Sequence, residues 1–332
     1  MIAILCGDAI QSPHLAATRT PEFLHLLPAI YFALPPWFSW NPLVSYVAAV
    51  LLLIIGVSIV IRKAPARANW VDRIVLCGPV FIAVPMVLFG LDHYLFPVEI
   101  GQFIPSWIPA HMFWVYFVGT CLILGGLSIV FQKYAWLSAG LFGLMLLCFE
   151  ALMNIPGLFE APHERITWTL MAREFSFSMG ALSFAAMHTR EWKTKGTHWL
   201  ISIARVVLGI ALLFFGVEYC LHPELLPGVP LEQLTPNFIP VPVLWGYLNS
   251  VVYLIAGICL ISNRKSRFAA TGAGLFVLFA VIFLCVPFML QYPSDIGKGL
   301  NVPADTLMLS GGLLCLAGSL REESLIKPSE TT

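Results

Sequence analysis

Charged residues are scarce in this 332-residue sequence, at 11%, whereas about 25% is usual for a soluble domain. Lysine plus arginine equals aspartate plus glutamate, at 18 each, so no excess of positive charge favours a nucleic acid partner. The eight cysteines form no CxxC pair and no cluster with histidine at metal-ligand spacing, so we expect neither a zinc site nor a disulfide framework. Hydrophobic residues, in contrast, make up 59% of the chain, which is typical of an integral membrane protein.

Long apolar stretches recur along the chain. A membrane-spanning helix needs about 20 mainly apolar residues, and nine stretches satisfy this: 43–62, 74–95, 112–131, 134–153, 167–187, 199–221, 243–262, 268–290 and 302–320. The remaining segments are too short for a soluble domain. We therefore expect an all-α integral membrane protein with nine transmembrane helices, in contact with the lipid bilayer. Residues 26–40 are apolar but too short to span, and we interpret them as an interfacial segment on the outer side.

Basic residues are distributed unevenly between the two sets of helix ends. One set holds thirteen of them: Arg62, Lys63, Arg67, Arg73, Lys133, Arg190, Lys193, Lys195, Arg264, Lys265, Arg267, Arg321 and Lys327. The opposite set holds Arg19, Arg165 and Lys298. Because basic loops stay in the cytoplasm, this asymmetry predicts an N-terminus outside and a C-terminus inside. Residues 1–10 lack a basic region and a cleavage site, so we do not expect a signal peptide.

The sequence also resembles itself. The tetrapeptide at 89–92, Phe-Gly-Leu-Asp, returns 126 residues later as Phe-Gly-Val-Glu. After a five-residue insertion in the second copy the spacing becomes 131. The matches at this spacing are 105–109 with 236–240, Trp114 with Trp245, Tyr116 with Tyr247, Gly126 with Gly257, Glu174 with Asp305, and Gly180 with Gly311. The tripeptide 140–142, Gly-Leu-Phe, also returns as 274–276. We interpret this pattern as a tandem duplication.

Each copy contains four of the predicted spans. An even number means that both copies enter the membrane from the same side, so the repeats are parallel and an inverted-repeat transporter is disfavoured. We therefore expect two parallel repeats of a four-helix bundle plus one N-terminal helix. The predicted divisions are an N-terminal segment with the first helix at 1–70, the repeats at 71–190 and 197–320, and a cytoplasmic tail at 321–332.

The first repeat carries a recognisable set of motifs. They are Gly90, Asp92, His93, Pro97, the segment 104–109 (Ile-Pro-Ser-Trp-Ile-Pro), Trp114, Tyr116 and the pair Gly125-Gly126. This pattern resembles the DoxX-like family of four-helix membrane proteins, and the resemblance extends to both repeats. It implies a bacterial cytoplasmic membrane protein, some relatives being membrane subunits of sulfur or amine oxidation systems that pass electrons toward quinone. The second copy departs from it, with Glu218-Tyr219 replacing Asp92-His93 and Ser250 replacing Gly119.

Ionisable groups inside hydrocarbon are costly, at roughly 2.5 to 3.5 kcal/mol on insertion scales, so each needs a reason. The predicted outer third of the spans holds ten polar candidates for ligand binding: Asp92, His93, Tyr116, Glu150, Arg173, Glu174, Glu218, Tyr247, Asn249 and Asp305. They could line a polar cavity open to the outside, with Arg173 as counter-ion. Alternatively, Asp92, Glu218 and Asp305 lie at wet helix ends and Glu174 merely pairs with Arg173.

Three functions are compatible with these residues. One is a component of a redox system that binds quinone at the outer polar cavity, where a carboxylate or His93 exchanges protons. No haem, flavin or CxxC motif supplies electrons, so this function requires a redox partner subunit. The second is a carrier for a small solute or ion, and the third is a noncatalytic scaffold or assembly factor. The Pro-rich loops 97–109 and 223–242 could be lids or rigid caps.

Overall fold

The computed structural model describes residues 40–188, 195–293 and 295–326, and these residues are almost entirely helical. Apart from one isolated bridge between Leu225 and Leu234, the described ranges contain no extended pairing. The interfacial segment predicted for 26–40 lies outside the described residues except for its last one. The last helix continues to Ile326, past the start of the predicted tail at 321, while its candidate membrane span ends at Leu320.

Eight helices of the described chain are long and apolar enough to cross a membrane, which confirms the membrane class. Their segments are α3 (Trp40–Lys63), α4 (Trp70–Leu76) with α5 (Gly78–Leu95), α7 (His111–Val130), α8 (Ala135–Phe149) with its continuation to Glu160, α11 (Lys195–Leu221), α12 (Pro242–Ile261), α13 (Ser266–Ala280) with its continuation to Gln291, and α15 (Val302–Ile326). The ninth predicted span, 167–187, is also a helix, α10 (Arg165–His188). Its ion pair and several serines make it less apolar, and it is buried inside the protein.

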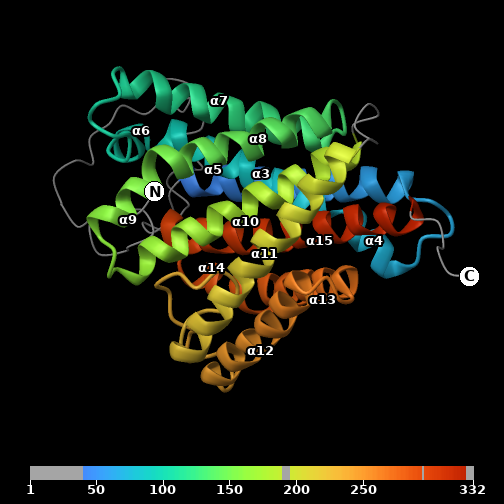
Figure 1. Cartoon of the computed structure of the whole chain (residues 1–332). Coiled ribbons are helices and arrows are strands. Elements are labelled where there is room, and N and C mark those ends of the chain that lie inside the picture. The colour runs from blue at the N-terminus through green and yellow to red at the C-terminus, as the bar shows by residue number, and fades with distance from the viewer. Residues whose placement is uncertain (1–39, 189–194, 294, 327–332) are drawn as a thin grey trace, which may run out of the picture.

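The helices form two groups around a central pair (Figure 1). In the first group α5 packs against α7, and α8 packs against α10. In the second group α11 packs against α12, and α13 packs against α15. Helices α10 and α15 contact each other at the centre, while α7 with α8 and α12 with α13 occupy opposite edges. Helix α3 packs mainly on α5. We name the end that carries Lys63, Lys133 and Arg264 the basic end, and the end that carries loops 96–110 and 222–241 the loop end.

The two groups share local backbone features at a spacing of 131 residues. Positive φ values occur at Ala110 and Val241, at Gln132 and Asn263, and at Tyr134 and Lys265. The indole of Trp114 donates to the carbonyl of Pro109 at 3.1 Å, and that of Trp245 donates to Pro240 at 3.1 Å. These pairs agree with the register read from the sequence in this part of the chain.

Two π-helical turns also recur at this spacing. The turn η2 (Glu150–Asn154) follows α8 and leads into α9 (Ile155–Glu160), and η4 (Val281–Cys285) follows α13 and leads into α14 (Val286–Gln291). A proline comes second in each following helix, at Pro156 and Pro287, and its missing N–H breaks the α-helical hydrogen-bond pattern one turn earlier. The helix therefore widens at that turn instead of continuing as an ideal α-helix.

The register toward the end of each copy differs from the sequence alignment. Ser178 Oγ donates to the carbonyl of Gly143 at 2.8 Å, and Ser310 Oγ donates to that of Gly274 at 2.8 Å. Gly143, not Gly140, therefore matches Gly274. The serine donors of these two bonds are 132 residues apart and their glycine acceptors 131. Gly180 lies against Gly312, so closely that a Cβ on Gly180 would be 2.3 Å from the Cα of Gly312.

The two loops at the loop end differ greatly. In loop 96–110, which includes α6 (Pro97–Gly101), only Gly101 is buried. In loop 222–241, all residues from Leu225 to Leu231 are buried. The five extra residues of the second copy therefore allow its loop to turn into the bundle, where it fills the space between the helices. We name residues 225–231 the plug.

Candidate functional site

An arginine-centred network links the two groups of helices. Arg173 on α10 donates from Nη1 to Oδ2 of Asp305 on α15 at 2.8 Å, and from Nη2 to Oε1 of Glu174 at 3.1 Å. The side chains of Arg173 and Asp305 are each only 1% exposed. The guanidinium also lies 5.8 Å above the ring of Phe177. Because this pair is withdrawn from water and lipid, its charges are held by each other and not by solvent.

Glu150 extends the network from the first π-helical turn. Its Oε1 accepts a hydrogen bond from Asn154 at 3.1 Å, and its carboxylate interacts electrostatically with Glu174 and Arg173. Both Glu150 and Asn154 lie in η2, so the widened turn places a carboxylate and an amide four residues apart on one face. Turns of this kind are frequent at functional sites.

Asp92 forms a related contact between α5 and the start of α15. Its carboxylate interacts with the side chain of Asn301, the last residue of η5 (Ile296–Asn301), and both residues are buried. Asn301 lies one turn before Asp305, so this contact is close along α15 to the arginine network. We name Asp92, Glu150, Arg173, Glu174, Asn301 and Asp305 the polar network.

The carboxylates of the polar network are incompletely satisfied within the described chain. One oxygen of each has no hydrogen-bond partner although it is buried: Asp92 Oδ1, Glu150 Oε2, Glu174 Oε2 and Asp305 Oδ1. Buried polar atoms without partners are rare in native proteins and call for an explanation such as a bound molecule or a catalytic role. Three carboxylates around one guanidinium also leave excess negative charge, which a proton, a cation or a polar ligand would compensate.

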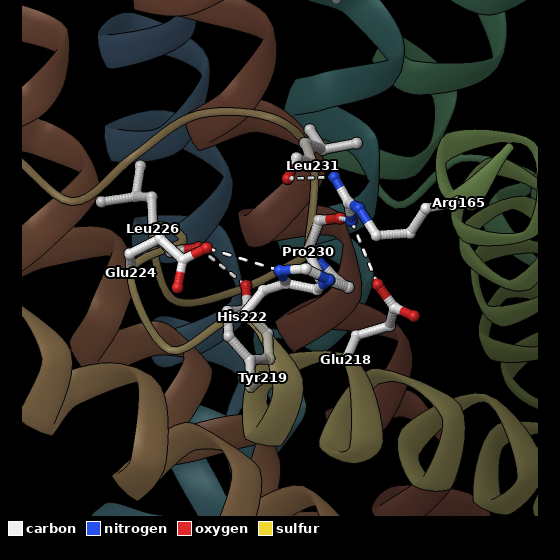
Figure 2. Close-up of polar contacts among 8 residues, drawn as sticks. All are labelled: Arg165, Glu218, Tyr219, His222, Glu224, Leu226, Pro230 and Leu231. Atoms are coloured by element: carbon white, nitrogen blue, oxygen red, sulfur yellow. Dashed lines mark hydrogen bonds and ion pairs between the residues drawn. The ribbon is translucent and has the colours of Figure 1, made fainter.

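A second polar cluster, Arg165, Glu218, Tyr219 and Tyr253, contacts the plug, and we name it the plug cluster (Figure 2). Arg165, the first residue of α10, donates to Oε2 of Glu218 on α11 at 3.2 Å. It also donates to the carbonyls of Pro230 and Leu231, at 2.7 and 3.2 Å. One guanidinium therefore joins a helix of the first group, a helix of the second group and the loop between α11 and α12.

Two buried tyrosines hold the plug from inside the bundle. Tyr219 donates to the carbonyl of Leu226 at 2.7 Å, and Tyr253 donates to that of Gly228 at 2.7 Å. Gly228 has a φ of +133°, a conformation that favours glycine, and its Cα faces Thr306 of α15. The phenols therefore satisfy two carbonyls of a turn that would otherwise lack partners inside the bundle.

The remaining candidates are not members of either cluster. His93 Nδ1 is 2.6 Å from the carbonyl of Phe89 in its own helix. His222, just after α11, has its Nδ1 3.4 Å from the carboxylate of Glu224, and both of these side chains are partly exposed. Tyr116 and Tyr247 are exposed on the outer surfaces of α7 and α12. Asn249 is fully buried one turn before Tyr253, beside the plug.

The structure thus brings together five of the ten predicted residues in the polar network and one, Glu218, in the plug cluster. Sequence reasoning missed Arg165, Asn154 and Asn301 as partners of these groups. Arg165 had one available signal, since it was among only three basic residues assigned to the outer side. No comparable sequence signal marked Asn154 and Asn301, because asparagine is common near helix ends.

The fold defines a multi-pass, all-α membrane protein. Residues 200–285, which form most of α11, all of α12 and the α13 region, match the family model described as DoxX. No curated protein and no solved structure matches this chain.

Proposed function

We propose that the chain comprises two parallel DoxX-like units, at 71–190 and 197–320, preceded by one helix. The support is the recurrence of positive φ values, indole hydrogen bonds, π-helical turns and serine contacts at spacings of 131 or 132 residues. Two contacts at the centre join residues that are themselves 132 apart, Gly180 with Gly312 and Arg173 with Asp305. Such self-matching contacts are expected on the axis of a two-fold arrangement.

We infer that the polar network is the functional site and that it exchanges protons with a small molecule, for which a quinone headgroup is our candidate. The observation that carries this proposal is the set of four buried carboxylates, each with one unpartnered oxygen, inside the bundle of helices. A bound quinone would supply two-electron, two-proton redox chemistry. Glu150 and Glu174 would hold or release the protons, and Arg173 would fix their orientation through its ion pairs.

The plug explains why we expect a small molecule to reach the polar network from the side of the first unit. In the second unit the space between the helices is filled by residues 225–231. Two carbonyl groups of this segment accept hydrogen bonds from the phenols of Tyr219 and Tyr253. The first unit lacks the five additional residues, and its loop 96–110 stays near the surface. A small molecule could therefore approach the polar network beneath loop 96–110, whereas the matching place in the second unit is already occupied.

Electrons for such a reaction would come from a redox partner subunit. We further propose a bacterial cytoplasmic membrane location, with the basic end in the cytoplasm and the loop end outside, from the unequal distribution of lysine and arginine. Reduction of a quinone by two electrons takes up two protons, which Glu150 and Glu174 would pass on from the outer side of the membrane.

A cation carrier is the second candidate. The excess of carboxylates over guanidinium groups in the polar network favours it, because a small cation would compensate that charge directly. It predicts cation-dependent uptake into proteoliposomes that is lost in Glu150→Gln. Uptake equal to that of empty liposomes would dismiss the carrier.

Direct binding of a short-chain quinone to the purified protein tests the main proposal. We expect Glu174→Gln, which keeps the side-chain size but removes the charge, to weaken binding about tenfold, corresponding to about 1.4 kcal/mol. Glu218→Gln is the matched control, because Glu218 is a similarly buried glutamate paired with an arginine in the plug cluster. Equal affinities of wild type and Glu174→Gln, with both proteins folded, would contradict the assignment.

A further inference from the structure

A cavity of about 550 Å³ lies at the basic end, far from the polar network along the helices. It is lined by the C-terminal parts of α3, α10 and α15, by the junction of α4 with α5, and by the turn between α7 and α8. Its volume is within the range of small-molecule sites, about 300 to 1,000 Å³. The cavity belongs neither to the polar network nor to the plug cluster.

The path of the chain creates this space. Helix α3 has no counterpart in the second group, and after it ends at Lys63 the chain crosses to α4 through residues 64–69. Helix α4 then stops at Leu76, and a separate helix starts at Gly78 because Pro79 cannot donate a backbone hydrogen bond. The offset of α4 and the crossing segment leaves the ends of α5, α10 and α15 incompletely covered.

The wall of the cavity changes from apolar to polar toward the membrane surface. Its deep part is formed by the buried side chains of Val80, Ile129, Leu314 and Cys315. Its mouth carries Lys63 and Gln132, with Tyr134 and Trp136 beside them. Tyrosine and tryptophan are typical of the headgroup level, where an amphipathic ring is favourable. The cavity therefore has the polarity of a site for a molecule with an apolar chain and a polar head.

The positive charge at the mouth of the cavity favours an anionic headgroup on the bound molecule. Lys63 is exposed and, within the described part of the chain, makes no ion pair. Lys133 follows Gln132 in the same turn, so a second cation is close along the chain. An apolar floor does not retain water, whereas an acyl chain would fill it and place a phosphate near the Lys63 ammonium.

We propose that this cavity binds one acyl chain of an anionic phospholipid, with the lipid phosphate held by Lys63. The site is independent of the proposed quinone chemistry at the polar network. The lipid would take the place of missing helix packing between α3 and the ends of α10 and α15. It would thereby fix the N-terminal helix to the first unit.

Lipid retention measured by native mass spectrometry in mild detergent tests this proposal. Phosphatidylglycerol and phosphatidylcholine with identical oleoyl chains are offered at equal concentration. We expect wild type to retain phosphatidylglycerol at least tenfold more than phosphatidylcholine. Lys63→Gln removes the cation, and its control is Lys265→Gln, at the same end on the turn before α13.

A second variant tests the apolar deep part of the cavity. A Cβ on Gly318 would meet only Val75, at 3.7 Å, so Gly318→Leu fills the cavity without a clash at its first atom. Gly272→Leu is its control. A Cβ on Gly272 would meet nothing within 4 Å, and Gly272 does not line the cavity. We expect Lys63→Gln and Gly318→Leu each to lower phosphatidylglycerol retention at least tenfold, and both controls to retain it.

Three results would overturn the proposal. They are equal retention of the two lipids by wild type, unchanged retention in either Lys63→Gln or Gly318→Leu, and loss of a copurified quinone, instead of the lipid, in these two variants. Thermal unfolding of each variant separates loss of the lipid from loss of the fold.

Discussion

Replacement of Arg173 by methionine leaves two buried carboxylates without their shared cation. In the native protein the guanidinium is 2.8 Å from Asp305 and 3.1 Å from Glu174, and it is 1% exposed. Removing one member of a buried ion pair typically destabilises a protein by about 3 to 5 kcal/mol, because an uncompensated charge stays buried. With two carboxylates affected, we expect Arg173→Met to reach this range. Asp305→Asn should cost less, about 2 to 3 kcal/mol, since Glu174 still pairs with Arg173.

The free energy of unfolding in mixed micelles, measured by fluorescence, provides the assay. The control is Arg267→Met, which breaks the Arg267–Asp72 pair at 3.0 Å; with Arg267 43% exposed, that loss should be below about 1 kcal/mol. The double variant Arg173→Asp/Asp305→Arg should recover only part of the stability, because Glu174 then adjoins a new carboxylate. Equal losses for Arg173→Met and Arg267→Met would refute the argument that the network is a buried, charge-dependent contact.

The plug and the central helix contact lead to further predictions. Arg165→Met should increase hydrogen exchange of residues 225–231 while α12 stays protected, and unchanged exchange would show that Arg165 does not hold the plug. Tyr253→Phe removes one hydrogen bond to the plug and should lower stability by about 1 kcal/mol; a neutral effect would mean that the carbonyl finds another partner. Gly180→Ala introduces a Cβ 2.3 Å from Gly312 and should destabilise by about 1 to 3 kcal/mol, whereas Gly157→Ala has open space and should not. Similar unfolding temperatures for these two variants would contradict the close packing of α10 on α15.

The sequence predicted the spanning helices well because apolar length is a direct consequence of bilayer thickness. The segment 167–187 illustrates where that rule weakens. It is helical as predicted, but its polar residues face other helices and not lipid, so its composition does not distinguish a buried central helix from an ordinary span. Burial by neighbouring helices is a tertiary property that hydropathy does not record.

The polar network was predicted in part for the same reason. Glu150, Arg173, Glu174 and Asp305 stood out because ionisable groups are rare in hydrocarbon, and the structure places them together. Tyr116 and Tyr247 were predicted at similar depths in the membrane, but their side chains face away from the bundle. The position of a residue along a helix does not indicate on which side of the helix it lies. The plug was not predicted, although the five-residue insertion that makes it possible was visible in the alignment of the two copies.

The central claim is that the polar network binds a proton-exchanging small molecule. Its most direct test is purification from the native membrane in mild detergent, followed by mass spectrometry of all small molecules and proteins that remain bound. Our account predicts stoichiometric quinone with wild type, its loss in Glu174→Gln and its retention in Glu218→Gln. Recovery of no small molecule, together with a reproducible partner protein in all three preparations, would contradict the account and identify the chain as a scaffold.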